Sequence, residues 1–247
     1  MPQTFTKRRG DAPEQFFAAE AAGLRWLAVP GGVAVAGVHA VTRTSLTIDR
    51  VAAGSPGTAA AEEFGRGLVT THDAGASFFG IGPDGAPGVG WIGDAPLPLR
   101  DAPPSSWGAW YAADRLLFHA RRAHLADPAL DRVMERLAAG DFDDGSPPAR
   151  LHGDLWSGNV LWSPDGVVLI DPAAHGGHRL TDLAMLALFG TPQLARIHAA
   201  YAEASTQLPD GWRELIGLHQ LHPLLVHAEL FGGGYRSQAV EMARRYS

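Results

Sequence analysis

The sequence predicts an α+β chain of two lobes, with short strands in a small N-terminal lobe and mostly helices in a larger C-terminal lobe. Residues 33–38 and 45–48 alternate enough between apolar and polar side chains for strands. Residues 52–58 are rich in Gly, Ser, Pro and Ala, which is typical of a boundary between lobes. We therefore place a partial N-terminal lobe at 1–52 and a helical lobe at 53–247.

Helical periodicity predicts the remaining elements. The expected helices cover residues 13–27, 60–72, 106–123, 127–139, 182–188, 192–205 and 212–229, with a last helix after the glycine-rich loop at 232–235. The first helix is expected to open after Asp11, with Glu14 three residues on, as a variant of the capping box. Residues 74–104 are dominated by glycine and proline, so we expect a long irregular segment there.

A β-hairpin is expected around the Ser-Pro-Asp-Gly turn at 163–166. Its proline fixes one φ and its glycine permits a positive φ. Apolar runs at 160–162 and 167–170 flank the turn and read as its two strands. This register pairs Trp162 with Val167.

Polar side chains stand at the open end of this hairpin. In the expected register Asn159 lies nearly across from Ile170 and beside Asp171. Opposed residues in such a ladder are roughly 5 Å apart, so Asn159 and Asp171 can share one small cation. Asp154, five residues before Asn159, is then free to act as a base.

This set of residues matches the needs of phosphoryl transfer. The reaction requires a carboxylate near the attacking hydroxyl and oxygen ligands that hold Mg²⁺ against the phosphates of ATP. Asp-x4-Asn followed by a hairpin and a second Asp has the spacing of the catalytic and metal loops of kinases. An ordinary hairpin with a polar entry loop is the alternative. The three parts in order favour Asp154 as base, Asn159 and Asp171 as metal ligands, and ATP and Mg²⁺ as cofactors.

Four sequence motifs resemble those of a known family. They are GDLWSGNVL at 153–161, LIDPA at 169–173, DLAM at 182–185 and LFG at 188–190. They resemble the fructosamine (ketosamine) kinases, which belong to the aminoglycoside-phosphotransferase-like branch of the protein-kinase-like fold. Trp156 and the Ser-Gly that follows it distinguish this motif from the corresponding loops of antibiotic and choline kinases, which usually carry other residues there. The resemblance implies ATP-dependent phosphorylation of the sugar 3-hydroxyl of ketosamines, the glycation adducts of amines. A kinase for another hydroxylated metabolite, such as an aminoglycoside or amino alcohol, is the alternative within the same fold.

Lys7 is the one lysine among 20 basic residues. A compact ammonium and a planar guanidinium fork are not interchangeable, so a lone lysine in an arginine-rich chain suggests a site that arginine cannot fill. The resemblance places Phe5-Thr6-Lys7 on the strand whose lysine binds the ATP phosphates, and it assigns Glu20 as the acid that pairs with this lysine. The alternative is a surface lysine and a solvated helical glutamate.

The resemblance also implies several supporting roles. Asp49 to Val51 fall at the family's hinge, where backbone groups bind adenine. His152 is expected to brace the catalytic loop, and Asp182 to hydrogen-bond back to it. Trp156 is expected to support the site. The glycine-rich segment that contains Trp91 is expected to border the sugar site.

One feature departs from the family pattern. The lysine strand of the family follows two strands joined by a Gly-rich turn that covers the nucleotide phosphates, and only six residues precede Lys7. Gly10 and Gly31-Gly32 follow the lysine strand, so they cannot replace that turn. We therefore expect a lobe that lacks its first two strands and the Gly-rich turn, with weak ATP binding. A truncated, weakly active or non-catalytic member of the fold is a further alternative.

Composition argues against other classes of protein. A net charge of −6 gives no general electrostatic footprint for nucleic acid. No apolar run approaches the ~18 residues of a membrane span, and the N-terminus has no signal-peptide core. The absence of cysteine excludes disulfides and thiolate metal sites, with a cytoplasmic location as the default expectation. We expect a monomer whose partner is a small-molecule or protein-bound ketosamine, without nucleic acid or membrane.

Overall fold

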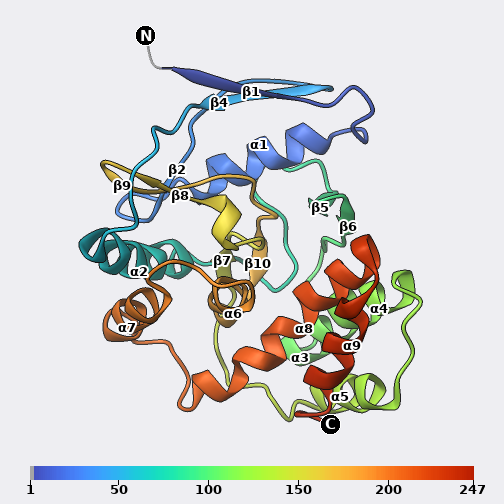
Figure 1. The fold of residues 1–247 in the computed structure, drawn as a ribbon. Helices are drawn as coiled ribbons and strands as arrows, with labels where there is room; N and C mark the ends of the chain where they lie inside the picture. The colour runs from blue at the N-terminus through green and yellow to red at the C-terminus, as the bar shows by residue number, and fades with distance from the viewer. Residues whose placement is uncertain (1–2) are drawn as a thin grey trace.

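A three-stranded antiparallel sheet forms one end of the molecule in this computed structural model, which describes residues 3–247 (Figure 1). Its strands are β1 (Thr4–Arg8), β4 (Ser45–Asp49) and β3 (Val38–Thr42), in the order β1-β4-β3. Helix α1 (Phe16–Leu27) lies beneath this sheet. The helical part of the chain occupies the opposite end, so the expected α+β arrangement of two lobes is confirmed.

Helix α1 packs on the sheet through one apolar face. Phe17, Ala21 and Leu24 recur at helical spacing and are buried against Leu46 and Ile48 of β4. The face therefore fixes the helix, together with Glu20 on it, beneath the strand that carries Lys7.

The expected start of α1 was wrong. The helix begins at Phe16, and Gln15 before it adopts a left-handed φ of 66° without a side-chain cap. The amide of Phe16 donates to the Pro13 carbonyl at 3.2 Å, so residues 13–16 form a turn instead of a first helical turn. The proposed Asp11–Glu14 capping box is not formed.

The expected strand at 33–38 was also wrong, because the chain changes sheets within it. β2 (Ala34–Val35) pairs in parallel with β9 (Gly166–Leu169), and β3 begins only at Val38. Between them, the amide of Gly37 donates to a carboxylate oxygen of Asp49 at 2.8 Å. A lobe boundary at residue 52 would therefore divide the β2–β9 pair, and that boundary stays a prediction.

The hairpin of β8 (Val160–Ser163) and β9 has the register expected from its turn. Trp162 pairs with Val167, and the Ile170 amide donates to the Asn159 carbonyl at 3.2 Å. The β2–β9–β8 sheet thus brings the open end of the hairpin next to the N-terminal part of the chain.

Two other strand pairs were not expected. β7 (Ala149–Leu151) pairs with β10 (His175–Gly177) across the base of the hairpin. β5 (Gly90–Ile92) and β6 (Ala95–Leu97) form a short hairpin inside the glycine- and proline-rich segment. The strands are three residues long and β6 contains Pro96, so their composition resembles that of a loop.

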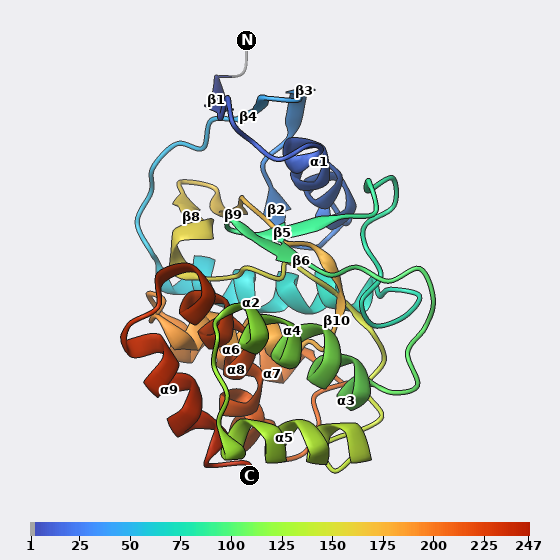
Figure 2. The same ribbon diagram turned by 90° about the vertical axis from the view of Figure 1, so that its right-hand side faces the viewer.

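The helices of the larger lobe gather below the strands in Figure 2. Their bounds lie within a few residues of the expected spans. They are α2 (Thr58–Asp73), α3 (Trp107–Trp110), a π-helical stretch (Tyr111–Leu117), α4 (Phe118–Arg122), α5 (Pro128–Ala139), α6 (Leu180–Leu188), α7 (Leu194–Ala204), α8 (Trp212–Phe231) and α9 (Gly234–Ala243). No helix among the described residues is both long and apolar enough to cross a membrane.

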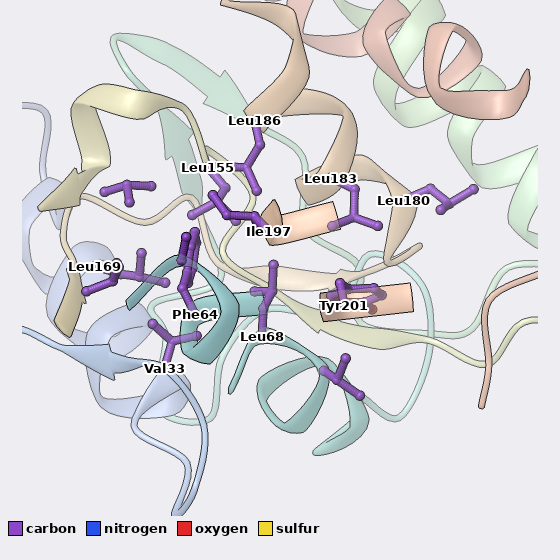
Figure 3. Packing of buried hydrophobic residues seen from close by; sticks show 14 of the residues in the cluster. Val33, Phe64, Leu68, Leu155, Leu169, Leu180, Leu183, Leu186, Ile197 and Tyr201 are labelled. Carbon is purple, nitrogen blue, oxygen red and sulfur yellow. The ribbon is translucent and has the colours of Figure 1, made fainter. Parts of the chain in front are cut away.

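One hydrophobic cluster fixes the hairpin to the helical lobe (Figure 3). Phe64 of α2, Leu183 of α6 and Ile197 of α7 pack in one cluster with Leu169 of β9 and with Leu155 of the loop between β7 and β8. Dense packing of this kind holds the loop between β7 and β8 on a rigid support.

Candidate active site

A cleft of about 390 Å³ lies where β1, α1, the hairpin and the β5–β6 segment meet. The polar side chains that sequence analysis assigned to phosphoryl transfer all line it: Lys7, Glu20, Asp154, Asn159 and Asp171. These residues come from the N-terminal segment and from residues 154–171, and the β2–β9 pairing and α1 bring them together.

Lys7 holds two acids in place at the top of this cleft. Its Nζ donates to Glu20 Oε1 at 2.5 Å and also to Asp171 Oδ1. Burial raises the pKa of Glu20, although the positive charge of Lys7 acts in the opposite direction. The lysine therefore links α1 to the residue that follows β9.

Asp154 lies on the loop between β7 and β8. Burial raises the pKa of its carboxyl to about 7, against the hydrogen bond that Asn159 donates to it. The Nδ2 of Asn159 donates to the Asp154 carbonyl at 2.8 Å and to Asp154 Oδ2 at 3.1 Å. This carboxyl is thus prepared to change its protonation state near neutral pH.

Asp182 anchors the same loop from below. It is completely buried, and its carboxylate accepts hydrogen bonds from the amides of His152 at 2.8 Å and Gly153 at 2.9 Å. His72 Nε2 lies 3.1 Å from Asp182 Oδ2. Burial alone would raise the pKa of Asp182, but the hydrogen bond from His72 and the other nearby donors lower it.

His152 connects the two halves of the site. Its Nδ1 accepts from the Asp154 amide at 3.3 Å, so its Nε2 carries the proton donated to the Ile170 carbonyl at 2.9 Å. Burial lowers the pKa of this histidine, which keeps the ring neutral. The ring therefore connects the backbone of Ile170, just before Asp171, to the backbone of Asp154. It does not line the cleft itself.

Trp156 forms part of the cleft wall beside Asp154. It is 41% exposed, which is unusual for so large an apolar side chain. Its ring lies over Gly158, where a Cβ would collide with the indole. The Trp-Ser-Gly motif therefore holds a half-exposed aromatic face next to the carboxylate of Asp154.

The structure does not bring the two expected hinge residues into the cleft. Neither Asp49 nor Val51 lines it. The carboxylate of Asp49 accepts from the Gly37 amide at 2.8 Å and contacts His39 Nε2 at 2.6 Å, so it ties β4 to the start of β3. Their role in binding adenine stays a prediction.

Sequence analysis expected the segment that contains Trp91 to border the sugar site, but it did not predict the other apolar residues of the cleft. Phe16, Val89, Leu97 and Leu99 line it together with Trp91. The two-residue Gly93-Asp94 turn between β5 and β6 was the available signal, since such turns join short antiparallel strands.

Comparison with known proteins agrees with this geometry. The family model described as fructosamine kinase matches residues 2–246. The chain belongs to the fructosamine kinase family. Among its relatives, a probable ketoamine kinase of Synechocystis is 35% identical over 188 residues, or 73% of this chain and 60% of the relative. The match thus spans less than two thirds of that relative's length.

Solved structures extend the family comparison to the fold. A Thermobifida fusca structure described as a fructosamine-3-kinase is 44% identical, with a TM-score of 0.88 over 99% of this chain and 85% of that one. A choline kinase of Streptococcus pneumoniae gives a TM-score of 0.64 at 16% identity, over 99% of this chain and 87% of its own. At that identity it shares the fold alone, and it confirms the protein-kinase-like architecture of this family member.

Proposed function

We propose that this chain is an ATP-dependent kinase that phosphorylates a sugar hydroxyl of ketosamines. One observation carries the proposal: a basic side chain, two acids and an Asp–Asn pair from distant parts of the sequence line a single cleft. Membership of the fructosamine kinase family supports the acceptor class. Glycation repair is the use that such an activity would serve.

Asp154 is the group that would accept the proton of the attacking hydroxyl. A base works best when its pKa lies close to the working pH, and burial raises the pKa of Asp154 to about 7. Lys7 would bind the phosphates of ATP, with Glu20 orienting it through the 2.5 Å contact. Trp156 offers an aromatic face to the acceptor beside this base.

The donors present fit a magnesium ion. Mg²⁺ prefers oxygen ligands and keeps several waters, so a carboxylate and an amide oxygen suffice when phosphates supply the others. Asn159 uses its Nδ2 toward Asp154, which leaves Oδ1 for a cation beside the carboxylate of Asp171. When bound, the ion would neutralise phosphate charge.

A coupled assay of ATP consumption tests the proposal. Fructoselysine and ribuloselysine should each stimulate ADP release at millimolar MgATP, whereas the free sugars fructose and ribulose should stimulate it less. Consumption that no ketosamine changes would contradict the proposed acceptor. A stronger response to an aminoglycoside or amino alcohol would favour another metabolite kinase of the same fold.

Substituting Lys7 by arginine should lower kcat/KM by about 10²-fold, the typical cost of losing one preorganised electrostatic contact. The wide guanidinium cannot occupy the position of the ammonium between Glu20 and Asp171. Arg43→Lys, the reverse exchange at an exposed turn of the same lobe, is the matched control and should leave kcat/KM unchanged. Equal activity of Lys7→Arg and wild type would remove Lys7 from phosphate binding.

The pH profile of kcat/KM should show an acidic limb with an apparent pKa near 7. The base acts only when ionised, and the raised pKa of Asp154 means that protonation begins at neutral pH. Activity should therefore fall about tenfold per pH unit below the pKa and reach a plateau above it. Initial rates from pH 5 to 9, with circular dichroism as a check on folding, measure this. A flat profile down to pH 5 would show that Asp154 does not titrate in the reaction.

A further inference from the structure

The cleft has two walls of opposite chemistry. One carries the charged and amide side chains described above. The other is mostly apolar, and its main side chains are Phe16, Val89, Trp91, Leu97 and Leu99. Arg9 also lines the cleft, with its guanidinium over the ring of Phe16. A contiguous apolar wall that faces a few convergent polar groups is typical of a small-molecule site.

The apolar wall is held in place by contacts between the β5–β6 hairpin and the N-terminal part of the chain. The ring of Trp91 meets that of Phe16 edge-to-face with centroids 5.6 Å apart. In the turn of the same hairpin, Asp94 Oδ1 accepts from Arg9 Nη1 at 2.5 Å. Leu97 is buried against Val226 of α8. The wall is therefore preformed instead of being a mobile loop tip.

The apolar wall lies away from the hinge segment, where the adenine of the nucleotide is expected to bind. No residue of the 50–57 segment lines the cleft. Figure 1 shows that segment and the β5–β6 hairpin on opposite sides of the molecule, with the hairpin β8–β9 between them. If the phosphates of ATP bind at Lys7, the adenine lies toward the hinge segment. The apolar wall is then on the other side of the transferred phosphate, where the acceptor binds.

A ketosamine presents two kinds of surface to such a cleft. Its sugar hydroxyls need hydrogen-bond partners, so burying them against Trp91 and Leu99 would be unfavourable. The substituent on its nitrogen is hydrocarbon when the parent amine is aliphatic or aromatic, and burying hydrocarbon is favourable. On the basis of the function proposed above, we propose that the wall around Trp91 receives this substituent, so that the chain selects ketosamines of hydrophobic amines.

The test compares two acceptors that share the sugar and differ in the amine: the fructosamine of hexylamine and the fructosamine of glycine. For wild type, kcat/KM should be about 10- to 100-fold higher with the hexylamine adduct, the range expected for burying one medium-sized apolar group. Trp91→Ala should lower kcat/KM for the hexylamine adduct toward the value for the glycine adduct, so that most of this preference is lost. Calorimetric titration of each adduct measures the same preference without turnover.

Two further variants keep the test decisive. Val89→Asp places a charge in the wall at a residue that is already 42% exposed, so it should fold normally and still abolish the preference. Phe231→Ala removes a 68% exposed aromatic that does not line the cleft, and it should leave the preference intact. Loss of the preference in Phe231→Ala as well would overturn the assignment to this wall.

Failure of this inference can be distinguished from failure of the proposed function. If wild type phosphorylates both adducts equally, or if Trp91→Ala weakens ATP binding instead of acceptor binding, the wall does not receive the amine substituent while the kinase activity stands. If neither adduct is phosphorylated, the proposed acceptor class fails. The calorimetric titrations then still test the inference. It requires the hexylamine adduct to bind more tightly than both the glycine adduct and free hexylamine.

Discussion

Asp154→Asn should lower kcat by about 10²- to 10⁴-fold, the range expected when a general base is removed. The amide has nearly the shape of the carboxyl, so the cleft and the contacts of Asn159 should persist. Nucleotide affinity should change little, because Lys7 and Asp171 are untouched. Steady-state rates with a ketosamine, together with a calorimetric titration of MgATP, separate the two effects.

Asp165→Asn is the matched control for this experiment. Asp165 lies in the exposed turn between β8 and β9, eleven positions further along the same segment. It undergoes the same chemical change outside the cleft, so its kcat should equal that of wild type. A variant Asp154→Asn that keeps wild-type kcat would remove this carboxyl from the mechanism.

Asp182→Ala should destabilise the protein by about 3–5 kcal/mol, the cost of breaking one side of a buried charged network. The substitution leaves the amides of His152 and Gly153 and the ring of His72 without their acceptor in a fully buried position. Urea unfolding monitored by tryptophan fluorescence measures the loss in free energy of unfolding. The catalytic loop should loosen with it, so kcat should fall as well.

Asp210→Ala, at an exposed loop position before α8, provides the comparison. A substitution on the surface is expected to change the free energy of unfolding by no more than about 0.5 kcal/mol. If Asp182→Ala were equally mild, the hydrogen bonds from the catalytic loop to Asp182 would not be what holds that loop in place.

The catalytic half of the site was predictable because its chemistry is local in sequence. Turn residues fixed the register of the hairpin, so Trp162 pairs with Val167 and Asn159 lies near Asp171 as expected. The helix carrying Glu20 could likewise be placed from its periodicity, and the family resemblance paired Glu20 with Lys7, which it contacts. The roles of these residues in the reaction stay predictions.

The parts that sequence analysis missed depend on contacts between distant segments. The run at 33–38 looks like one strand, but β2 finds its partner in β9, more than 100 residues away. The apolar cleft wall arises only because Trp91 docks on Phe16. The hydrogen bond that the Asp49 carboxylate accepts from the Gly37 amide is another contact that the sequence did not indicate. Local propensity does not encode such pairings.

The most direct test of the central claim is to identify the product. The chain is incubated with millimolar MgATP and fructoselysine, and the mixture is resolved by mass spectrometry and phosphorus NMR. We predict one phosphorylated fructoselysine for each ADP formed, with both lost in Asp154→Asn. Formation of ADP without phosphorylated acceptor, or formation of the product at an unchanged rate in Asp154→Asn, would contradict phosphoryl transfer by this cleft.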